Sequence, residues 1–401
     1  APATTTAPAT TAAPRRPRLL GIDAARGLAL IGLVSVHILP AVDPVTLSPT
    51  GQWTVFAGRS AALFALLAGV GLALSSGGRN PHRGRVLTAD RVGLLVRAAL
   101  VAALGLGINE LMPDSVPAVG ILVYYGVFFL LAVPFLGLSA PVLLAAALFF
   151  AVAGPVLVHL THDALPAYAS PNPTFIDLAT TPGATAAQLL LTGTFPALPY
   201  LTYVLAGMAL GRLDLADVQV QVLLLLAGIG LAVSAWLVYW ALILQSGGYD
   251  QLMVHTPELS EDRIDEIITW GPDPDLPTTT WWWLLISGPH TNTPVALLHG
   301  LGTGAAALGF FLLLARLAGK WLLPLVAMGS MTLTLYSAHL LALTTEVHYD
   351  RPLPWFLVHL AVAVLFAVAW RRFLGQGPLE RLVARVASAV RRPVLPAEHR
   401  T

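Results

Sequence analysis

The sequence contains no cysteine among its 401 residues. Disulfide bonds, zinc–thiolate sites, iron–sulfur clusters and a cysteine nucleophile are therefore excluded, and any covalent chemistry must use oxygen or nitrogen atoms. Lysine is nearly absent as well. Lys320 is the one lysine, and the other Lys/Arg positions are all arginine, a bias that fits a high-GC bacterial genome.

Charged residues are scarce too. They make up 11 % of the chain, whereas hydrophobic residues make up 56 % and the mean hydropathy is +0.74. Soluble proteins carry about 25 % charged residues, so this composition cannot cover a water-exposed surface. The chain is therefore expected to be an integral membrane protein with the lipid bilayer as a partner. The net charge of +1 indicates no particular partner, and nothing supports binding to nucleic acid.

Long apolar stretches fill most of the chain. Each has about 20 residues, enough to cross about 30 Å of hydrocarbon as a helix. Ten such stretches lie at residues 19–41, 53–75, 90–109, 117–137, 139–160, 187–211, 217–244, 294–317, 320–344 and 353–373. Because the runs are continuous, they favour helices over a transmembrane β-barrel. The sequence thus predicts an all-α polytopic transmembrane helix bundle of about ten spans.

Basic residues fall almost entirely on one side of this topology. With loops alternating from the N-terminus, the other side holds only Arg263 and Arg351. The basic side holds Arg15, Arg16, Arg18, Arg79, Arg83, Arg85, Arg212, Arg316, Lys320, Arg371, Arg372, Arg381, Arg385, Arg391 and Arg392. Short cytoplasmic loops carry the excess of Lys and Arg. Both termini are therefore predicted to be cytoplasmic, in a multi-pass protein of the bacterial cytoplasmic membrane.

Three regions follow from this pattern. Residues 1–18 are rich in Ala, Pro and Thr and are predicted to form a disordered cytoplasmic tail. Residues 19–373 hold the spans. Residues 374–401 alternate apolar residues with arginines, so a basic amphipathic helix is expected on the inner leaflet. A tight hairpin near Gly137 and a capped short helix after Ser260 are also predicted.

The first span carries ionisable residues. Asp23 and Arg26 stand three residues apart and can pair. His37 follows Arg26 by eleven residues. That spacing is close to three helical turns, so the two share one helix face with a rise of roughly 16 Å between them. Ionisable groups inside a membrane are costly, which favours a functional role. The alternative is that Asp23 and Arg26 anchor the helix while His37 bonds to a neighbouring helix.

Further candidates lie near the outer ends of other spans. Arg59 lies in the second span and His299 near the start of the eighth. Tyr336 and His339 stand three residues apart in the ninth span and share a face. His339 has the same predicted depth as His37. Helix packing is the alternative role for the hydroxyl residues of this span.

Several short motifs recur in a familiar order. Asp23-Ala24-Ala25-Arg26-Gly27 precedes an apolar run to His37, and the later motifs are Gly58-Arg59-Ser60 with Gly69 and Gly71, Leu205-Ala206-Gly207-Met208, Met328-Gly329-Ser330 with Tyr336 and His339, and Gly377-Pro378-Leu379-Glu380. The ordered set resembles the bacterial transmembrane acyltransferases, in particular the heparan-alpha-glucosaminide N-acetyltransferase-like group. The resemblance extends from about Arg18 to Val386.

This resemblance implies transfer of an acyl group, acetyl above all, from cytoplasmic acyl-CoA to a hydroxyl or amine of an extracytoplasmic sugar or glycolipid. Acyl-CoA would be the donor substrate, and no metal is expected. The implied roles are donor binding for Asp23 and Arg26, catalysis for His37 and His339, and substrate contacts for Arg59, His299 and Tyr336.

One departure from the group changes the assignment of the base. The heparan group has its catalytic histidine in the extracytoplasmic loop before the sixth span, and the corresponding stretch here, residues 188–194, contains no histidine. His37, which matches the histidine of the broader opening signature, is therefore the preferred general base. Direct attack by the acceptor and a transient acyl-imidazole both remain open.

A secondary transporter or lipid flippase is the rival interpretation. The same charged and histidine side chains would then line a path through the membrane. Against it, no internal repeat relates the two five-span halves, and no interrupted helices are expected in matching positions. The acceptor, the acyl chain length and the oligomeric state stay open, a homo-oligomer included. Neither a phosphate-binding glycine loop nor a metal-ligand pair at i, i+4 spacing occurs.

Overall fold

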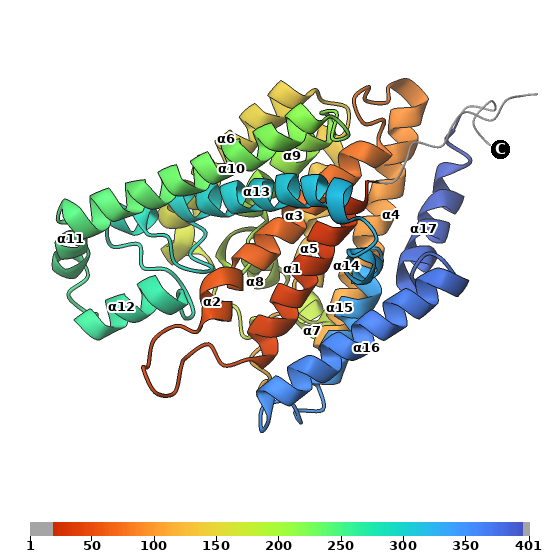
Figure 1. Ribbon diagram of the computed structural model, residues 1–401. Helices are drawn as coiled ribbons and strands as arrows, with labels where there is room; N and C mark the ends of the chain where they lie inside the picture. Colours follow the sequence, from red (N-terminus) through yellow and green to blue (C-terminus); the bar gives the residue numbers. More distant parts are fainter. Residues whose placement is uncertain (1–18, 396–401) are drawn as a thin grey trace, which may run out of the picture.

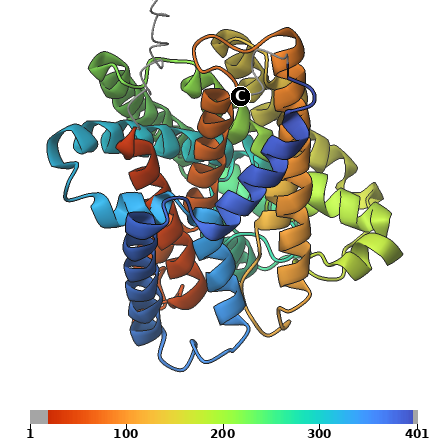
Figure 2. The same ribbon diagram turned by 90° about the vertical axis from the view of Figure 1, so that its right-hand side faces the viewer.

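The computed structural model describes residues 19–395, which fold almost entirely into helices (Figures 1 and 2). The longer helices are α1 (Leu20–Ile38), α3 (Arg59–Ser75), α4 (Gly84–Asn109), α5 (Leu122–Ala132), α6 (Ala140–Thr161), α9 (Ala197–Gly211), α10 (Val218–Tyr239), α12 (Glu261–Trp270), α13 (Pro294–Ala318), α15 (Thr332–Leu343), α16 (Pro352–Phe373) and α17 (Pro378–Arg391). The shorter segments are α2 (Gly51–Phe56), η1 (Val133–Phe135), η2 (His162–Ala164), α7 (Phe175–Thr180), α8 (Pro182–Ala187), η3 (Gln188–Thr192), η4 (Trp240–Gln245), α11 (Gly248–His255), η5 (Trp281–Leu285) and α14 (Leu323–Gly329). The all-α prediction is confirmed for the described residues, whose only β contact is an isolated bridge between Val42 and Pro49.

The predicted spans can be compared with these helices one by one. Within residues 19–395, seven helices are long and apolar enough to cross a membrane, and nine are reached if each of two bent helix pairs counts as one span. The fourth predicted stretch, 117–137, forms the shorter apolar segment Leu122–Phe135. A polytopic helical bundle is thus confirmed. The predicted tail at residues 1–18 lies outside the described part of the chain.

Two predicted spans are bent. The sixth is bent by 49° between Pro182–Thr192 and Ala197–Gly211, at a point where the ring of Pro196 removes a backbone donor. The ninth is bent by 80° between α14 and α15, so this stretch, like the sixth, is not one straight helix. At this break Met331 has φ −141° and ψ 43°, outside the helical region. The bend turns α15 away from the axis of α14, and both helices contact α1.

Close helix crossings hold the interior together. A Cβ added to Gly207 of α9 would lie 1.9 Å from the carbonyl oxygen of Leu66 in α3. A Cβ added to Gly329 of α14 would lie 1.7 Å from the carbonyl oxygen of Asp23 in α1. At both crossings, only glycine lets the two helix backbones come this close. The small-residue motifs at these positions therefore have a packing role, as is usual at membrane helix interfaces.

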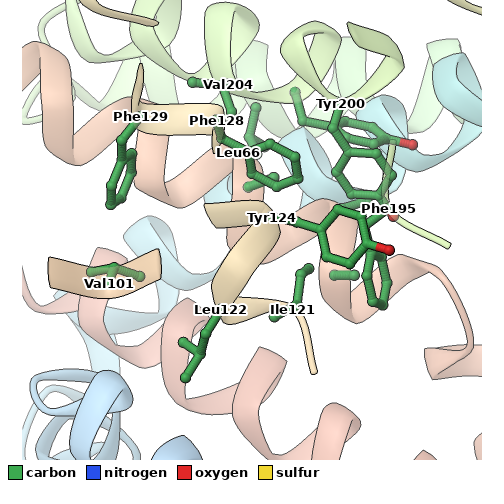
Figure 3. Packing of buried hydrophobic residues seen from close by; sticks show 14 of the residues in the cluster. Leu66, Val101, Ile121, Leu122, Tyr124, Phe128, Phe129, Phe195, Tyr200 and Val204 are labelled. Atoms are coloured by element: carbon green, nitrogen blue, oxygen red, sulfur yellow. The ribbon is translucent and has the colours of Figure 1, made fainter. Parts of the chain in front are cut away.

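Aromatic side chains fill the core between α5 and α9 (Figure 3). Phe128 stacks on Tyr200 with ring centroids 5.3 Å apart. Phe195 meets Tyr124 edge-on at 5.5 Å. Such pairs add to the burial energy of large rings. The short helix α5 is thus fixed by packing inside the bundle.

The edges of the bundle differ. α10 and α13 run side by side along one flank (Figure 1). α16 lies at another edge, with Ala367 as its one buried residue (Figure 2).

α17 forms as predicted and packs on α4, where Arg391 pairs with Asp90. Glu380 accepts hydrogen bonds from the backbone N–H of Thr334, at 3.1 Å, and from its hydroxyl, at 2.6 Å. These contacts attach α17 to α15 as well.

Two local predictions are confirmed. The chain turns sharply between the end of η1 at Phe135 and the start of α6 at Ala140. The Ser260 side chain accepts a hydrogen bond from the Arg263 N–H at 3.3 Å, which caps α12. The helix stops at Gly271, whose φ of 99° suits glycine.

Arg212, buried at the end of α9, connects that helix to neighbouring turns. Its guanidinium donates to the carbonyl oxygens of Ala73 (3.0 Å), Gly78 (2.8 Å) and Leu136. Removing the donor leaves buried carbonyls unpaired, a change that costs about 3 kcal/mol. We expect Arg212→Ala to lower the melting temperature of the detergent-purified protein by several degrees. The exposed Arg79→Ala variant should melt like the parent, and equal melting of all three proteins would contradict this role.

Candidate functional site

A cavity of about 780 Å³ lies where α1, α4, α5, α15 and α17 meet. Arg26 of α1, Arg97 of α4 and Arg371 of α16 line it. Glu380 is the one carboxylate among the lining residues, so cations outnumber anions. We call it the arginine cavity. Guanidinium groups bind phosphates and carboxylates in a bidentate manner, which suits this cavity to a multiply charged anion.

Arg26 is held from two sides. The Asp23 carboxylate lies 3.6 Å from its guanidinium, and Nη2 donates to the carbonyl oxygen of Leu67 at 3.1 Å. A Cβ at Gly71 would come within 2.8 Å of Nη2, so this glycine leaves room for the side chain. Asp23 is buried and is not among the lining residues. The arrangement places Arg26 on the cavity and Asp23 behind it, where Asp23 orients the guanidinium.

Two of the three arginines, Arg97 and Arg371, were not predicted from the sequence as site residues. Arg97 lies in the middle of α4 and interacts electrostatically with Arg26. An arginine at such a depth in a span is a signal that could have identified it. Arg371 lies in the last turn of α16 beside Arg372, so no feature of the sequence distinguishes it. Tyr125 of α5 also lines the cavity.

His37 and His339 form a contact where the end of α1 packs against α15. Nδ1 of His37 lies 3.1 Å from Nε2 of His339, and the two rings stack at 5.3 Å with an interplanar angle of 7°. Tyr336, which lines the arginine cavity, lies 6.3 Å from each ring. The structure therefore brings three of the predicted site residues together. They come from α1 and α15, which the bend at Met331 makes neighbours.

Two more histidines continue this row. Nδ1 of His339 lies 3.0 Å from Nδ1 of His359 in α16, and the rings of His359 and His348 are 4.7 Å apart. His359 is half-buried on α16, at the edge of the bundle. His348 is 2 % exposed because the turn before α16 folds it inward. Its burial lowers its pKa below the usual value.

Arg59 and His299 meet elsewhere, in a cavity of about 50 Å³ beside Tyr203. His299 Nδ1 lies 3.4 Å from the hydroxyl of Ser287, and the Arg59 guanidinium donates to the carbonyl oxygen of Thr54. Neither residue is among the lining of the arginine cavity. They form a separate polar site next to the loop that precedes α13.

His290, on that loop, is a residue that sequence reasoning missed. It lines both the Arg59 cavity and a second cavity of about 80 Å³. Its φ of 56° and the φ of 52° at Asn292 fall in the left-handed region, where residues other than glycine store strain. Burial lowers the pKa of His290 to about 4, so its ring is neutral near pH 7.

Metal binding by this site has no structural support. Between residues 19 and 395 no cluster of three or more His, Asp or Glu side chains is arranged to hold a metal ion. In the histidine row, His37, His339 and His359 are joined by hydrogen bonds, and His348 is in ring contact with His359.

The fold and the site together define a polytopic helical membrane protein with a cationic cavity that extends to Tyr336, beside a buried histidine pair. The family model described as heparan-alpha-glucosaminide N-acetyltransferase, catalytic, matches residues 18–242, more than half of the chain. The chain therefore belongs to this family of membrane acetyltransferases. A search of curated proteins finds no significant match. The matched region ends within η4, before the segments that supply His290, His339 and Arg371.

Proposed function

We propose that this protein transfers an acyl group, acetyl above all, from acyl-CoA to a hydroxyl or amine of an extracytoplasmic sugar or glycolipid. The observation that carries the proposal is the arginine cavity ending at Tyr336, beside the pair of His37 and His339. Family membership supports the reaction class. The volume of about 780 Å³ lies within the usual range of about 300–1,000 Å³ for ligand sites.

The donor enters from the arginine-rich end, which the positive-inside rule assigns to the cytoplasm of the bacterial cell. Arg26, Arg97 and Arg371 bind the phosphates of CoA. The thioester at the other end of the donor then lies toward Tyr336 and His37. We include α17 in the functional unit because Glu380 and Val383 line the same cavity.

His37 acts as the general base. In neutral tautomers, His37 Nδ1–H donates to His339 Nε2 and His339 Nδ1–H donates to His359 Nδ1, which satisfies both short contacts. Nε2 of His37 is then the free basic nitrogen. It takes the proton of the acceptor as the acceptor oxygen or nitrogen attacks the thioester carbon. The C–S bond breaks, and the CoA thiolate receives that proton.

Tyr336 and Arg59 have supporting roles. The Tyr336 oxygen accepts from the Ile121 N–H at 3.4 Å, which leaves its own O–H to stabilise the oxyanion. Arg59 and His299, on the separate polar site near His290, contact the polar part of an acceptor that approaches from the outer face. A preorganised donor of this kind is the largest single contribution in many acyl transfers.

A transporter is the second candidate, because the bundle contains two bent spans and a row of histidines. Such breaks commonly form substrate sites in transporters. The bent spans are, however, the sixth and the ninth. These positions do not correspond under a five-plus-five repeat.

Transfer itself is the decisive test. We expect purified protein in lipid nanodiscs, given acetyl-CoA labelled in the acetyl group, to transfer the label to an extract of cell-envelope glycans and lipids and to release free CoA thiol. Heat-unfolded protein is the control. Folded protein that neither binds acetyl-CoA by calorimetry nor releases thiol would contradict the enzyme and favour the transporter.

A further inference from the structure

A second large cavity, of about 450 Å³, lies on the other side of α15 from the arginine cavity. Helices α1, α15 and α16 form its walls. We call it the lateral groove. Its lining includes Leu335 and His339 of α15, His348, and Val358, His359 and Ala363 of α16.

The lining of the groove contains no arginine, lysine or carboxylate. Apart from two threonines, its polar side chains are His339, His359 and His348. All three belong to the row that begins at His37. The groove is therefore apolar along its length and polar only where it meets this row of histidines. Such a lining suits a hydrocarbon chain and excludes phosphates.

The groove opens toward the lipid-facing side of the bundle. Val358 and Val362 line it and are also exposed at the surface, at 45 % and 60 %. α16 stands at the edge of the bundle in both ribbon views (Figures 1 and 2) and buries only Ala367. An apolar opening on a transmembrane helix faces lipid tails, so a chain can enter from the bilayer without crossing water.

The two large cavities approach the same histidine pair from opposite faces of α15. Leu333 and Tyr336 face the arginine cavity, whereas Leu335 and His339 face the lateral groove. The polar cavities beside His290 measure about 50 and 80 Å³, too small to enclose a sugar with its chain. One large cavity thus suits a polyanionic donor and the other an apolar molecule.

We infer that the acceptor is an amphiphilic membrane lipid whose hydrocarbon chain lies in the lateral groove and whose hydroxyl or amine head reaches His339 and His37. This inference rests on the proposed function and narrows its acceptor from a sugar or glycolipid to a membrane lipid. It explains why the row of histidines ends in a lipid-facing groove. The head group loses its proton to His37 as described above, and CoA leaves through the arginine cavity.

The first test compares acceptors that differ only in their chain. Methyl, octyl and dodecyl glucosides are offered to the nanodisc protein with labelled acetyl-CoA. We expect kcat/KM to rise at least about tenfold from the methyl to the dodecyl compound, because a bound chain raises the effective concentration of the head. Equal kcat/KM for methyl and dodecyl glucoside would overturn the lipid acceptor while leaving acyl transfer intact.

The second test fills the groove. Ala363→Trp places a large ring in the lining, whereas Ala361→Trp adds the same ring to an exposed position of α16 that is not part of the lining. We expect Ala363→Trp to remove most of the gain from chain length, Ala361→Trp to retain it, and both to bind acetyl-CoA like the parent. If Ala363→Trp instead selects against palmitoyl-CoA relative to acetyl-CoA, the groove holds the donor chain and the inference is wrong.

A binding measurement separates this inference from the enzymatic proposal. Dodecyl glucoside carrying a photoreactive diazirine in its chain should label peptides of α15 and α16, and unlabelled dodecyl glucoside should compete. Labelling that persists unchanged in Ala363→Trp would overturn the inference whether or not transfer is detected. Competed labelling without any acetyl transfer would support the lipid site and contradict the proposed function alone.

Discussion

His37→Gln is expected to lower acetyl transfer by at least about 100-fold, because general base catalysis contributes about 10²–10⁴ to such reactions. Glutamine retains polar atoms to meet His339 at the 3.1 Å contact but has no basic nitrogen. The arginine cavity does not include His37, so acetyl-CoA binding should change by less than about twofold. Initial rates of label transfer and calorimetric titration with acetyl-CoA measure the two effects on the same preparation.

The control for this variant is His255→Gln, which changes an exposed histidine of α11. It should transfer acetyl groups at the parental rate. Parental transfer by a well-folded His37→Gln protein would exclude His37 as the base. Equal loss of transfer and of acetyl-CoA binding, with the melting temperature preserved, would contradict the division between a donor cavity and a catalytic centre.

The sequence was sufficient to predict most of the helices and some residues of the candidate site. Continuous apolar runs predict spans because hydrocarbon requires every backbone group to bond within its own helix. Ionisable residues inside such runs are rare, which identifies Arg26 and His37. The spacing of Tyr336 and His339 predicts their common location, since residues three apart lie on one side of a helix.

The contacts between helices could not be predicted in this way. His37 and His339 are 302 residues apart in the chain. Their contact depends on the 80° bend between α14 and α15. That bend follows the close crossing of Gly329 on the backbone of Asp23, a tertiary feature that leaves no periodic pattern in the sequence.

Arginines illustrate a second limit of sequence reasoning. Counting cations per loop predicts which end of the bundle is basic, and it treats Arg371 like its exposed neighbour Arg372. Which of them lines a cavity depends on how α16 and α17 close over α1 and α4. Three arginines around one space place like charges together, which costs energy unless an anion binds between them. The donor cavity is therefore best tested through these side chains.

Each of the variants Arg26→Gln, Arg97→Gln and Arg371→Gln is expected to weaken acetyl-CoA binding by at least about tenfold. A charge-assisted hydrogen bond contributes about 1.5–3 kcal/mol, and one factor of ten corresponds to about 1.4 kcal/mol. Arg26→Gln should have the largest effect, because the contacts with Asp23 and Leu67 fix its guanidinium before the ligand arrives. Calorimetric titration in nanodiscs measures the three dissociation constants.

Salt and a matched variant separate specific binding from general attraction. Arg85→Gln removes an exposed arginine of the same helix as Arg97 that does not line the cavity, and it should bind acetyl-CoA like the parent. Raising the salt concentration should weaken binding to the parent more than to the three cavity variants, since each variant has lost one cavity cation that meets phosphate. If Arg85→Gln weakens binding as much as Arg97→Gln does, the effect is a surface potential and the cavity is not the donor site. If dephospho-CoA, which lacks one phosphate, binds the parent as tightly as CoA and none of the cavity variants differs from it, the arginines serve another anion.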